Sequence, residues 1–422
     1  MSVDAAAVPA IVARARGAAA ALRVLPAEEK RRALAALADA IEAASDELLE
    51  ANAADVADAE AAGQRPALVD RLRLTPDRVR AIAAGVRQVA ELPDPVGQIT
   101  NVRQRPNGMQ VAQMRTPIGV ILMIYEARPG VTADAAALCV KAGNAAILRG
   151  GREARRSNAA IGGLLARVGL PDGAVQVLAD SDHALVAELL RSDGIDLVIP
   201  RGGERLIRSV VEHARMPVLK HFKGACHLFV DRDADLAMAE RLTVNAKAQR
   251  PSVCNALETL LVDAPVAPAF LPRVVRALRA AGVEVRGDAR TRELLAAADP
   301  TLAREVVGAT DADWGAEYLD YIIGVRVVDG LDEALAHIGR YSTGLADAIV
   351  TEDRARAQRF VAAVDSAAVL VNASTRLVDG GEFGLGAEIG ISTDRIGPRG
   401  PMGPAELTSL KWVVLGSGQI RT

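Results

Sequence analysis

Between residues 117 and 371, short apolar runs alternate with longer segments whose hydrophobic residues recur at helical spacing. Regular alternation of this kind predicts βαβ units, which build parallel sheets covered by helices. The expected strands span residues 118–124, 145–149, 174–178, 195–199 and 217–220 in a first block, and 258–262, 321–328, 346–350 and 368–371 in a second. The sequence therefore predicts an α/β fold with two α/β domains.

Two segments outside these blocks have a different character. Residues 4–90 are rich in alanine and keep a helical period, which predicts a layer of helices. Residues 97–115 carry strand-like segments around Arg105-Pro-Asn-Gly108, a turn sequence typical of a β-hairpin. We expect this hairpin to project as an oligomerisation arm, with an ordinary surface hairpin as the alternative.

Composition excludes several classes of function. The formal net charge is −3 with both signs well mixed, so neither nucleic acid nor a membrane surface is an expected partner. No apolar run is long enough to span a bilayer, and three scattered cysteines do not form a disulfide framework. The start, Met-Ser-Val-Asp, lacks the features of a signal peptide. We expect a cytoplasmic protein.

Cys254 is the residue whose sequence neighbours most clearly indicate a reactive side chain. It follows Lys247, Arg250 and a proline, and nearby positive charge favours the reactive thiolate. Cys139 and Cys226 lie in apolar runs and have the character of inert thiols. From these residues alone a cysteine hydrolase that pairs Cys254 with His221 or His227 remains an alternative. No metal site is expected, because the segment 221–227 offers too few convergent ligands.

Five collinear blocks give the chain a family resemblance. It resembles the aldehyde dehydrogenase superfamily, and within it the branch that reduces glutamyl phosphate. The blocks are residues 118–129, 141–151, 199–203, 245–255 and 371–392. The resemblance implies that the chain reduces L-glutamyl 5-phosphate with NADPH to L-glutamate 5-semialdehyde and phosphate, a step of proline biosynthesis. A non-catalytic relative is disfavoured because Cys254 and Glu317 are both present.

The resemblance also implies roles for individual residues. Cys254 falls on the family nucleophile, and Glu317 falls on the glutamate that holds the nicotinamide ribose. No G-x-G-x-x-G motif occurs, so NADP would bind without that loop. The expected cofactor-binding residues are Arg149, Gly150, Gly151 and Arg152, near the adenosine ribose and its 2′-phosphate, and Pro200, Gly202 and Gly203, beneath the pyrophosphate at a helix start.

The implied substrate carries a phosphate and a carboxylate, so its pocket requires fixed cations. Arg128, Lys247 and Arg250 are the expected substrate-binding residues, with surface ion pairing as the alternative for each. The glutamate base of hydrolytic relatives is missing, because residues 219–227 contain no carboxylate. The superfamily's oxyanion asparagine aligns near Ala127, whose side chain cannot donate. A CoA-acylating aldehyde dehydrogenase, which also lacks the base, is the main alternative function.

The resemblance implies a domain division as well. Residues 1–98 and 117–226 are expected to form the dinucleotide-binding domain, and residues 227–384 the catalytic domain. Residues 99–116 and 385–422 are expected to form the arm and a C-terminal tail. The implied assembly is a homo-oligomer, and glutamate 5-kinase is a candidate partner because it would supply the labile acyl phosphate.

Overall fold

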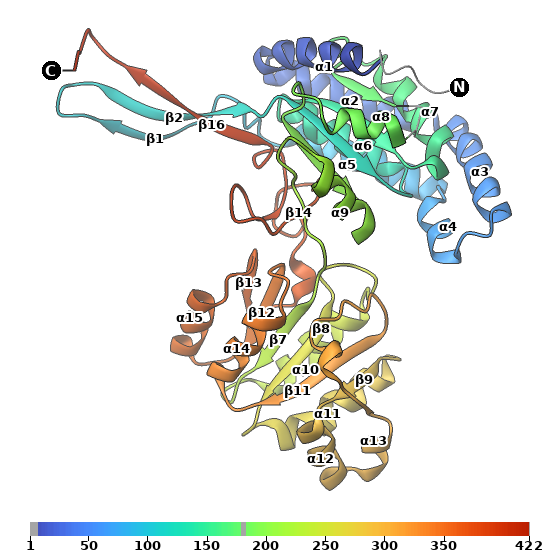
Figure 1. Ribbon diagram of the computed structural model, residues 1–422, viewed down its shortest axis with the longest axis vertical. Helices are drawn as coiled ribbons and strands as arrows, with labels where there is room; N and C mark the ends of the chain where they lie inside the picture. Colours follow the sequence, from blue (N-terminus) through green and yellow to red (C-terminus); the bar gives the residue numbers. More distant parts are fainter. Residues whose placement is uncertain (1–6, 179–182, 422) are drawn as a thin grey trace. The chain divides into compact units, whose positions relative to one another are not determined.

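The computed structural model describes residues 7–178 and 183–421 and divides the chain into two compact units (Figure 1). The first unit contains Met1–Lys220, Gly384–Gly390 and Met402–Thr422, and the second contains His221–Phe383 and Ile391–Pro401. The division falls after Lys220, whereas the sequence places it at residue 226. Part of the C-terminal tail belongs to each unit.

The first unit is built on a four-stranded parallel sheet with the order β5-β4-β3-β6. Its strands are β3 (Val120–Tyr125), β4 (Ala145–Gly150), β5 (Val175–Val177) and β6 (Leu197–Arg201). Side chains of β3 alternate between two cores: Ile121 and Met123 enter one, and Val120 and Leu122 enter the other. A strand that is buried on both faces forms one continuous apolar run in the sequence, which is why this strand could be predicted.

Helices cover both faces of this sheet. One face packs against α2 (Ala27–Ala43), α5 (Pro76–Glu91), α6 (Gly130–Lys141) and α7 (Arg155–Leu165). The other packs against α1 (Ala7–Val24), α8 (His183–Leu189) and α9 (Glu204–His213). Two further helices, α3 (Ser45–Ala61) and α4 (Pro66–Leu72), form a small core with Ala154 of the 3-10 turn η1 (Arg152–Ala154). The start of α5 shows how sequence sets a boundary: the Thr75 side chain accepts from Arg78 N, and Pro76 occupies the first turn.

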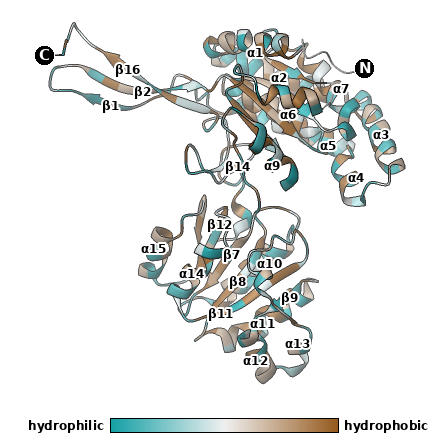
Figure 2. Ribbon diagram, in the orientation of Figure 1, coloured by the Kyte–Doolittle hydropathy of each residue, from teal (hydrophilic) through white to brown (hydrophobic). Residues whose placement is uncertain are grey.

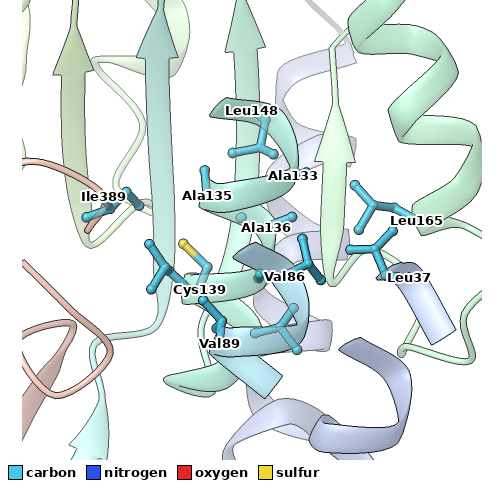
Figure 3. Packing of buried hydrophobic residues seen from close by; sticks show 14 of the residues in the cluster. Leu37, Val86, Val89, Ala133, Ala135, Ala136, Cys139, Leu148, Leu165 and Ile389 are labelled. Carbon is cyan, nitrogen blue, oxygen red and sulfur yellow. The ribbon is translucent and has the colours of Figure 1, made fainter. Parts of the chain in front are cut away.

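Cys139 lies deep in the first of these cores. Figure 3 shows its sulfur among Val86, Val89 and Ala135, on the inner face of α6. Burial raises the pKa of this thiol to about 12. Cys139 is therefore a packing residue, as its apolar sequence neighbours suggested.

The expected hairpin is present and gains a third strand. β1 (Ile99–Gln104) pairs antiparallel with β2 (Gln110–Pro117), and β2 pairs antiparallel with β16 (Thr408–Leu415) near the C-terminus. The three-stranded sheet projects from its unit (Figure 1). It exposes large apolar side chains, including Val102 and Trp412, which are 65% and 61% exposed.

The second unit is built on a seven-stranded parallel sheet with the order β10-β9-β11-β8-β7-β12-β13. The strands are β7 (Cys226–Val230), β8 (Leu257–Asp263), β9 (Glu284–Gly287), β10 (Val307–Gly308), β11 (Ile322–Val328), β12 (Ala346–Val350) and β13 (Ala368–Val371). Its central strands are largely hydrophobic (Figure 2). The α/β fold with parallel sheets that the sequence predicts is thus confirmed in both units.

Helices again lie on both faces. One face packs against α10 (Leu236–Ala248), α11 (Ala267–Ala280), α12 (Ala289–Ala298) and α13 (Pro300–Arg304). The other packs against α14 (Leu331–Tyr341) and α15 (Arg354–Ala363). The remaining elements are the 3-10 turns η2 (Asp311–Asp313) and η3 (Thr375–Leu377) and the short pair β14 (Ile391–Ser392) and β15 (Gly400–Pro401).

The expected elements differ from the structure in two respects. The strand predicted at 217–220 is wrong: only an isolated bridge joins Val218 to Val198. Pro217 accepts from Val198 N but has no N–H to donate, so the pairing does not extend. The predicted elements also omit the strands β9 and β10 and the helices α10, α12 and α13.

Candidate active site

Cys254 lies in the loop that joins α10 to β8. The helix ends at Ala248, shortly before Pro251, which disfavours helical geometry in the residue ahead of it. A turn hydrogen bond from Ala256 N to Val253 O, 3.1 Å long, encloses the cysteine. All three cysteines are described, and Cys254 is half-buried whereas Cys139 and Cys226 are buried. Of these thiols, Cys254 is the one that a substrate can reach.

Gly224 connects the nucleophile loop to a second predicted site residue. A Cβ atom at this glycine would lie 1.7 Å from the carbonyl oxygen of Cys254, so only glycine permits the approach. The Gly224 N–H donates to Glu317 Oε1 at 2.8 Å. Gly224 therefore lies against both Cys254 and Glu317, although these two residues are 63 positions apart in the sequence (317 − 254).

The loop that carries Glu317 is held by a dense polar network. The Asp313 carboxylate accepts from Thr310 N at 2.7 Å, from the Tyr318 hydroxyl at 2.7 Å and from Arg286 Nη1 at 2.8 Å. Burial alone would raise the pKa of Asp313, but these hydrogen bonds outweigh it and hold the pKa well below its usual range. Asp313 is therefore ionised, and its hydrogen bonds fix the loop that carries Glu317.

Arg376 is a residue of the site that the sequence did not single out. It lies in η3, directly after β13, and its Nε donates to Gln249 Oε1 at 2.9 Å. Its Nη1 donates to the side chain of Asn255, the residue after Cys254. Asn255 in turn donates to Val378 O at 2.9 Å. The segment after β13 is therefore fastened to the nucleophile loop.

Lys247 occupies a different place from the one expected. Its side chain is fully buried, and its Nζ lies 2.7 Å from Glu258 Oε2, also buried. Burial lowers the pKa of Lys247 and raises that of Glu258 to about 7, although each partner opposes the effect on the other. The structure thus places Lys247 inside the protein and leaves Arg250, which is exposed, as the cation of this loop.

Two histidines were alternatives as partners of the cysteine. His227 is fully buried in β7, and its Nδ1 lies 3.1 Å from Asp347 Oδ1. His221 Nδ1 lies 3.1 Å from the carbonyl oxygen of Ile391. His227 is therefore occupied by a structural carboxylate. No group of three or more His, Cys, Asp or Glu residues suited to a metal ion occurs within residues 7–178 and 183–421.

The expected cofactor residues gather in the first unit, at one edge of its sheet. In the parallel register, Tyr125 at the end of β3 pairs with Gly150 of β4 and with Arg201 of β6. The carboxyl ends of these three strands therefore meet, and ligands of open α/β sheets bind at such an edge. Arg149 is buried in β4, Arg152 opens η1 and is exposed, and Pro200 is buried in β6. Arg128 is exposed in the loop after β3.

The N-terminus of α9 already holds an anionic oxygen. The N–H of Gly203, the residue before the helix, donates to Glu126 Oε2 at 3.0 Å. A helix N-terminus favours negative charge, and the exposed Glu126 side chain can rotate away from it. The position is therefore chemically suited to a phosphate oxygen. Nearby, Ala127 N donates to Glu153 Oε1 at 2.6 Å, so the backbone of Ala127 is engaged as well.

The four predicted glycines are not equivalent. A Cβ at Gly150 would lie 2.0 Å from Asn158 Nδ2, so this glycine permits close packing of α7. A Cβ at Gly151 would meet the Glu153 carboxylate at 2.1 Å, and one at Gly202 would meet Glu126 at 2.3 Å. Those two neighbours are the ends of flexible side chains. Space is open around Gly203, which leaves its backbone accessible.

Comparison with known proteins places the chain in a family. The model of the aldehyde dehydrogenase family matches residues 1–295. An acetylating aldehyde dehydrogenase from Geobacillus thermoglucosidasius shares the fold, with a TM-score of 0.68 at 16% identity over 99% of this chain and 98% of that one. Sequence, fold and half-buried cysteine together define an aldehyde dehydrogenase-type enzyme.

More specific relatives are similar over the whole length. Curated gamma-glutamyl phosphate reductases from Caldanaerobacter subterraneus subsp. tengcongensis and Xanthomonas campestris pv. campestris are 51% and 52% identical, covering 97% and 98% of this chain and 98% and 99% of theirs. The solved gamma-glutamyl phosphate reductase of Thermotoga maritima has a TM-score of 0.94 at 44% identity, covering 98% of this chain and 100% of that one. The chain belongs to the gamma-glutamyl phosphate reductase family.

Aldehyde dehydrogenases use a nicotinamide cofactor, and this chain has the fold for one. No helix in the described part of the chain combines the length and apolarity needed to cross a membrane.

Proposed function

We propose that the chain reduces L-glutamyl 5-phosphate with NADPH to L-glutamate 5-semialdehyde and phosphate, in proline biosynthesis. One observation carries the proposal: in a chain 51% identical to a gamma-glutamyl phosphate reductase, Gly224 joins the accessible Cys254 to Glu317. These are the two residues that the reaction requires as nucleophile and as ribose ligand.

The chemistry follows from the Cys254 thiolate. Its sulfur attacks the carbonyl carbon of the acyl phosphate, the bond from that carbon to the phosphate oxygen breaks, and phosphate leaves. A thioester on Cys254 remains. The bound nicotinamide cofactor supplies hydride. The tetrahedral alkoxide that forms at the former thioester carbon then collapses: its carbon–sulfur bond breaks, the aldehyde is released and the Cys254 thiolate is restored.

Two arginines support NADPH as the reductant. Arg149 and Arg152 flank Gly150 and Gly151 where β4 ends, and guanidinium groups form charge-assisted hydrogen bonds with phosphate. The anion-binding end of α9 suits the pyrophosphate. We assign the 2′-phosphate to the two arginines.

The missing base supports phosphate as the acyl acceptor in the reverse reaction. Residues 219–227 contain no carboxylate, and the only ionisable side chains in this segment are those of Lys220, His221, Lys223, Cys226 and His227. Without a base to activate it, water attacks a thioester slowly. The acyl group is then retained on Cys254 until phosphate takes it.

The test is semialdehyde oxidation by the purified protein with NADP. In phosphate-free buffer, NADPH formation should stop after about one equivalent per Cys254, and inorganic phosphate should restart it. Parallel reactions with coenzyme A test the CoA-acylating alternative, because only an enzyme of that kind would turn over with the thiol. Steady turnover to free glutamate without an added acceptor would refute the assignment and point to an unrecognised base, with His221 the first residue to examine.

We also propose a cytoplasmic homo-oligomer, with the arm of β1, β2 and β16 as its contact. The exposed apolar side chains of that sheet support an interface. Glutamate 5-kinase is the proposed functional partner, since it would form the labile substrate.

A further inference from the structure

Two guanidinium groups lie beside the nucleophile. Arg250 is in the nucleophile loop itself, four residues before Cys254, and Arg376 reaches the same loop from the segment after β13. Burial and the neighbouring Arg250 lower the pKa of Arg376, while Asp379 and Cys254 oppose this effect. Arg376 also donates to Gln249, the residue directly before Arg250, which brings the two cations to the same loop.

Arg376 is fixed in orientation. Its Nε donates to Gln249 and its Nη1 donates to Asn255, which engages two of the nitrogen atoms of the planar guanidinium. Five N–H donors are available in an arginine side chain, so others remain for a ligand. The side chain is only half-buried, which leaves it accessible.

Arg250 is held by nothing comparable. Its side chain is exposed and takes part in no hydrogen bond or ion pair within the described residues. Other arginines of the same unit pair with a carboxylate, as Arg232 does with Asp263 and Arg356 does with Asp231. Asp379 is the one carboxylate among the groups that shift the pKa of Arg376. The site therefore retains an excess of positive charge.

We propose that Arg250 and Arg376 together bind the phosphoryl group, both as the leaving group of the acyl phosphate and as the inorganic phosphate of the reverse reaction. This inference rests on the proposed function and specifies how it is achieved. Two forked guanidinium groups match a dianion with several acceptor oxygens, whereas the substrate carboxylate carries one charge and needs one fork. Binding beside Asn255 keeps the phosphoryl group next to the sulfur that displaces it.

The pair also explains discrimination among acyl donors. A phosphoryl group brings two negative charges to a site that has an unmatched excess of positive charge. A neutral thioester leaves that excess unmatched, so the arginines favour acyl phosphates in binding. Arg376 is thus a specificity-determining residue in addition to Arg250.

The test measures phosphate dependence in the direction of semialdehyde oxidation. Arg250→Gln should raise the KM for inorganic phosphate at least about 10-fold, because a charge-assisted contact is lost, and change the KM for semialdehyde less than about 3-fold. Arg376→Gln should do the same, with Arg376→Lys intermediate because it keeps the charge but loses the fork. Arg354→Gln is the matched control, an exposed arginine of the same unit without a side-chain partner in the described residues.

A binding measurement without turnover complements the kinetics. Inorganic phosphate should slow alkylation of Cys254 by iodoacetamide in the wild-type protein, and the half-protecting concentration should rise at least about 10-fold in Arg250→Gln. Arg250 has no structural contact to lose, so misfolding does not confound this variant. Mass spectrometry of the alkylated peptide gives the readout.

The outcomes separate the two proposals. If the wild-type protein shows no phosphate-dependent NADP reduction, the proposed function fails. If the wild type shows it but both glutamine variants keep the wild-type KM for phosphate and the wild-type protection, the arginine pair is not the phosphoryl site. A rise in the KM for semialdehyde with unchanged phosphate dependence would assign the pair to the carboxylate and overturn the inference.

Discussion

The buried pair of Lys247 and Glu258 offers a sharp test of how the second unit is held together. Both side chains are excluded from solvent, and Glu258 Oε1 has no hydrogen-bond partner in the described residues. Replacing Lys247 with methionine keeps the volume but leaves Glu258 buried without its cation. Removal of one member of a buried ion pair costs about 3 to 5 kcal/mol.

The carboxyl group can escape only by binding a proton, and that also costs free energy. Burial raises the pKa of Glu258 from 4.5 to about 7 even with Lys247 present, and without the cation it rises further. The sign follows from the raised folded-state pKa: the cost is absent below the unfolded pKa, near 4.5, and grows as the pH rises toward the folded value.

The measurement is a double-mutant cycle by urea unfolding. Trp314 is buried in the second unit, so its fluorescence in a Trp412→Phe background follows that unit alone. We expect the free energy of unfolding at pH 7 to fall by about 3 kcal/mol or more in Lys247→Met and in Glu258→Leu, and by about 1 kcal/mol or less in the double variant. The deficit of Lys247→Met should shrink at pH 5.

Two results would contradict this reasoning. A loss of unfolding free energy below about 1 kcal/mol in Lys247→Met would mean that the pair is neutral or hydrated, because leaving a buried charge without its partner costs more than that. A double variant that is stable but has a KM for semialdehyde at least about 10-fold higher would restore the direct substrate contact that the sequence suggested for Lys247.

The remaining predictions concern the thiols and the cofactor. Cys254→Ala should abolish turnover and leave NADPH binding, measured by fluorescence titration, nearly intact, since the cofactor residues at the α9 and β4 ends lie in the other unit. Cys226→Ala should keep substantial activity, and more than a few per cent of wild-type kcat in Cys254→Ala would exclude the covalent route. Substituting Arg149 and Arg152 together should erode the ratio of kcat/KM for NADPH to that for NADH at least about 10-fold. An unchanged ratio would locate the 2′-phosphate elsewhere.

The parallel sheets could be predicted from sequence because their strands are buried on both faces. Strand β3 is an uninterrupted apolar run, and the helices between the strands keep a helical period. Cys254 could be proposed as the reactive cysteine from sequence as well, since its flanking charges and proline are local features. β9 and β10 could not, because these short strands carry few apolar residues.

The position of Arg376 lay beyond local sequence for a topological reason. Its strand, β13, is at one edge of a sheet in which sequence order and spatial order differ, so its neighbour cannot be read from the chain. The burial of Lys247 follows from the phase of its helix. Ala239, Thr243 and Ala246 are all fully buried, and this spacing puts Lys247 on the same inward face of α10. That periodicity was available in the sequence and indicates burial.

Gly224 couples the proposed nucleophile and the proposed ribose ligand through the backbone. Its N–H donates to Glu317, and the lack of a side chain lets Cys254 O approach. A carboxylate in this segment, such as the base of hydrolytic relatives, would bring a negative charge beside Cys254 and favour the protonated thiol. A backbone donor instead fixes Glu317 without adding charge. The segment therefore suits an enzyme that keeps its thioester from water, and the positive charge of Arg250 and Arg376 is left to select the anionic acyl donor.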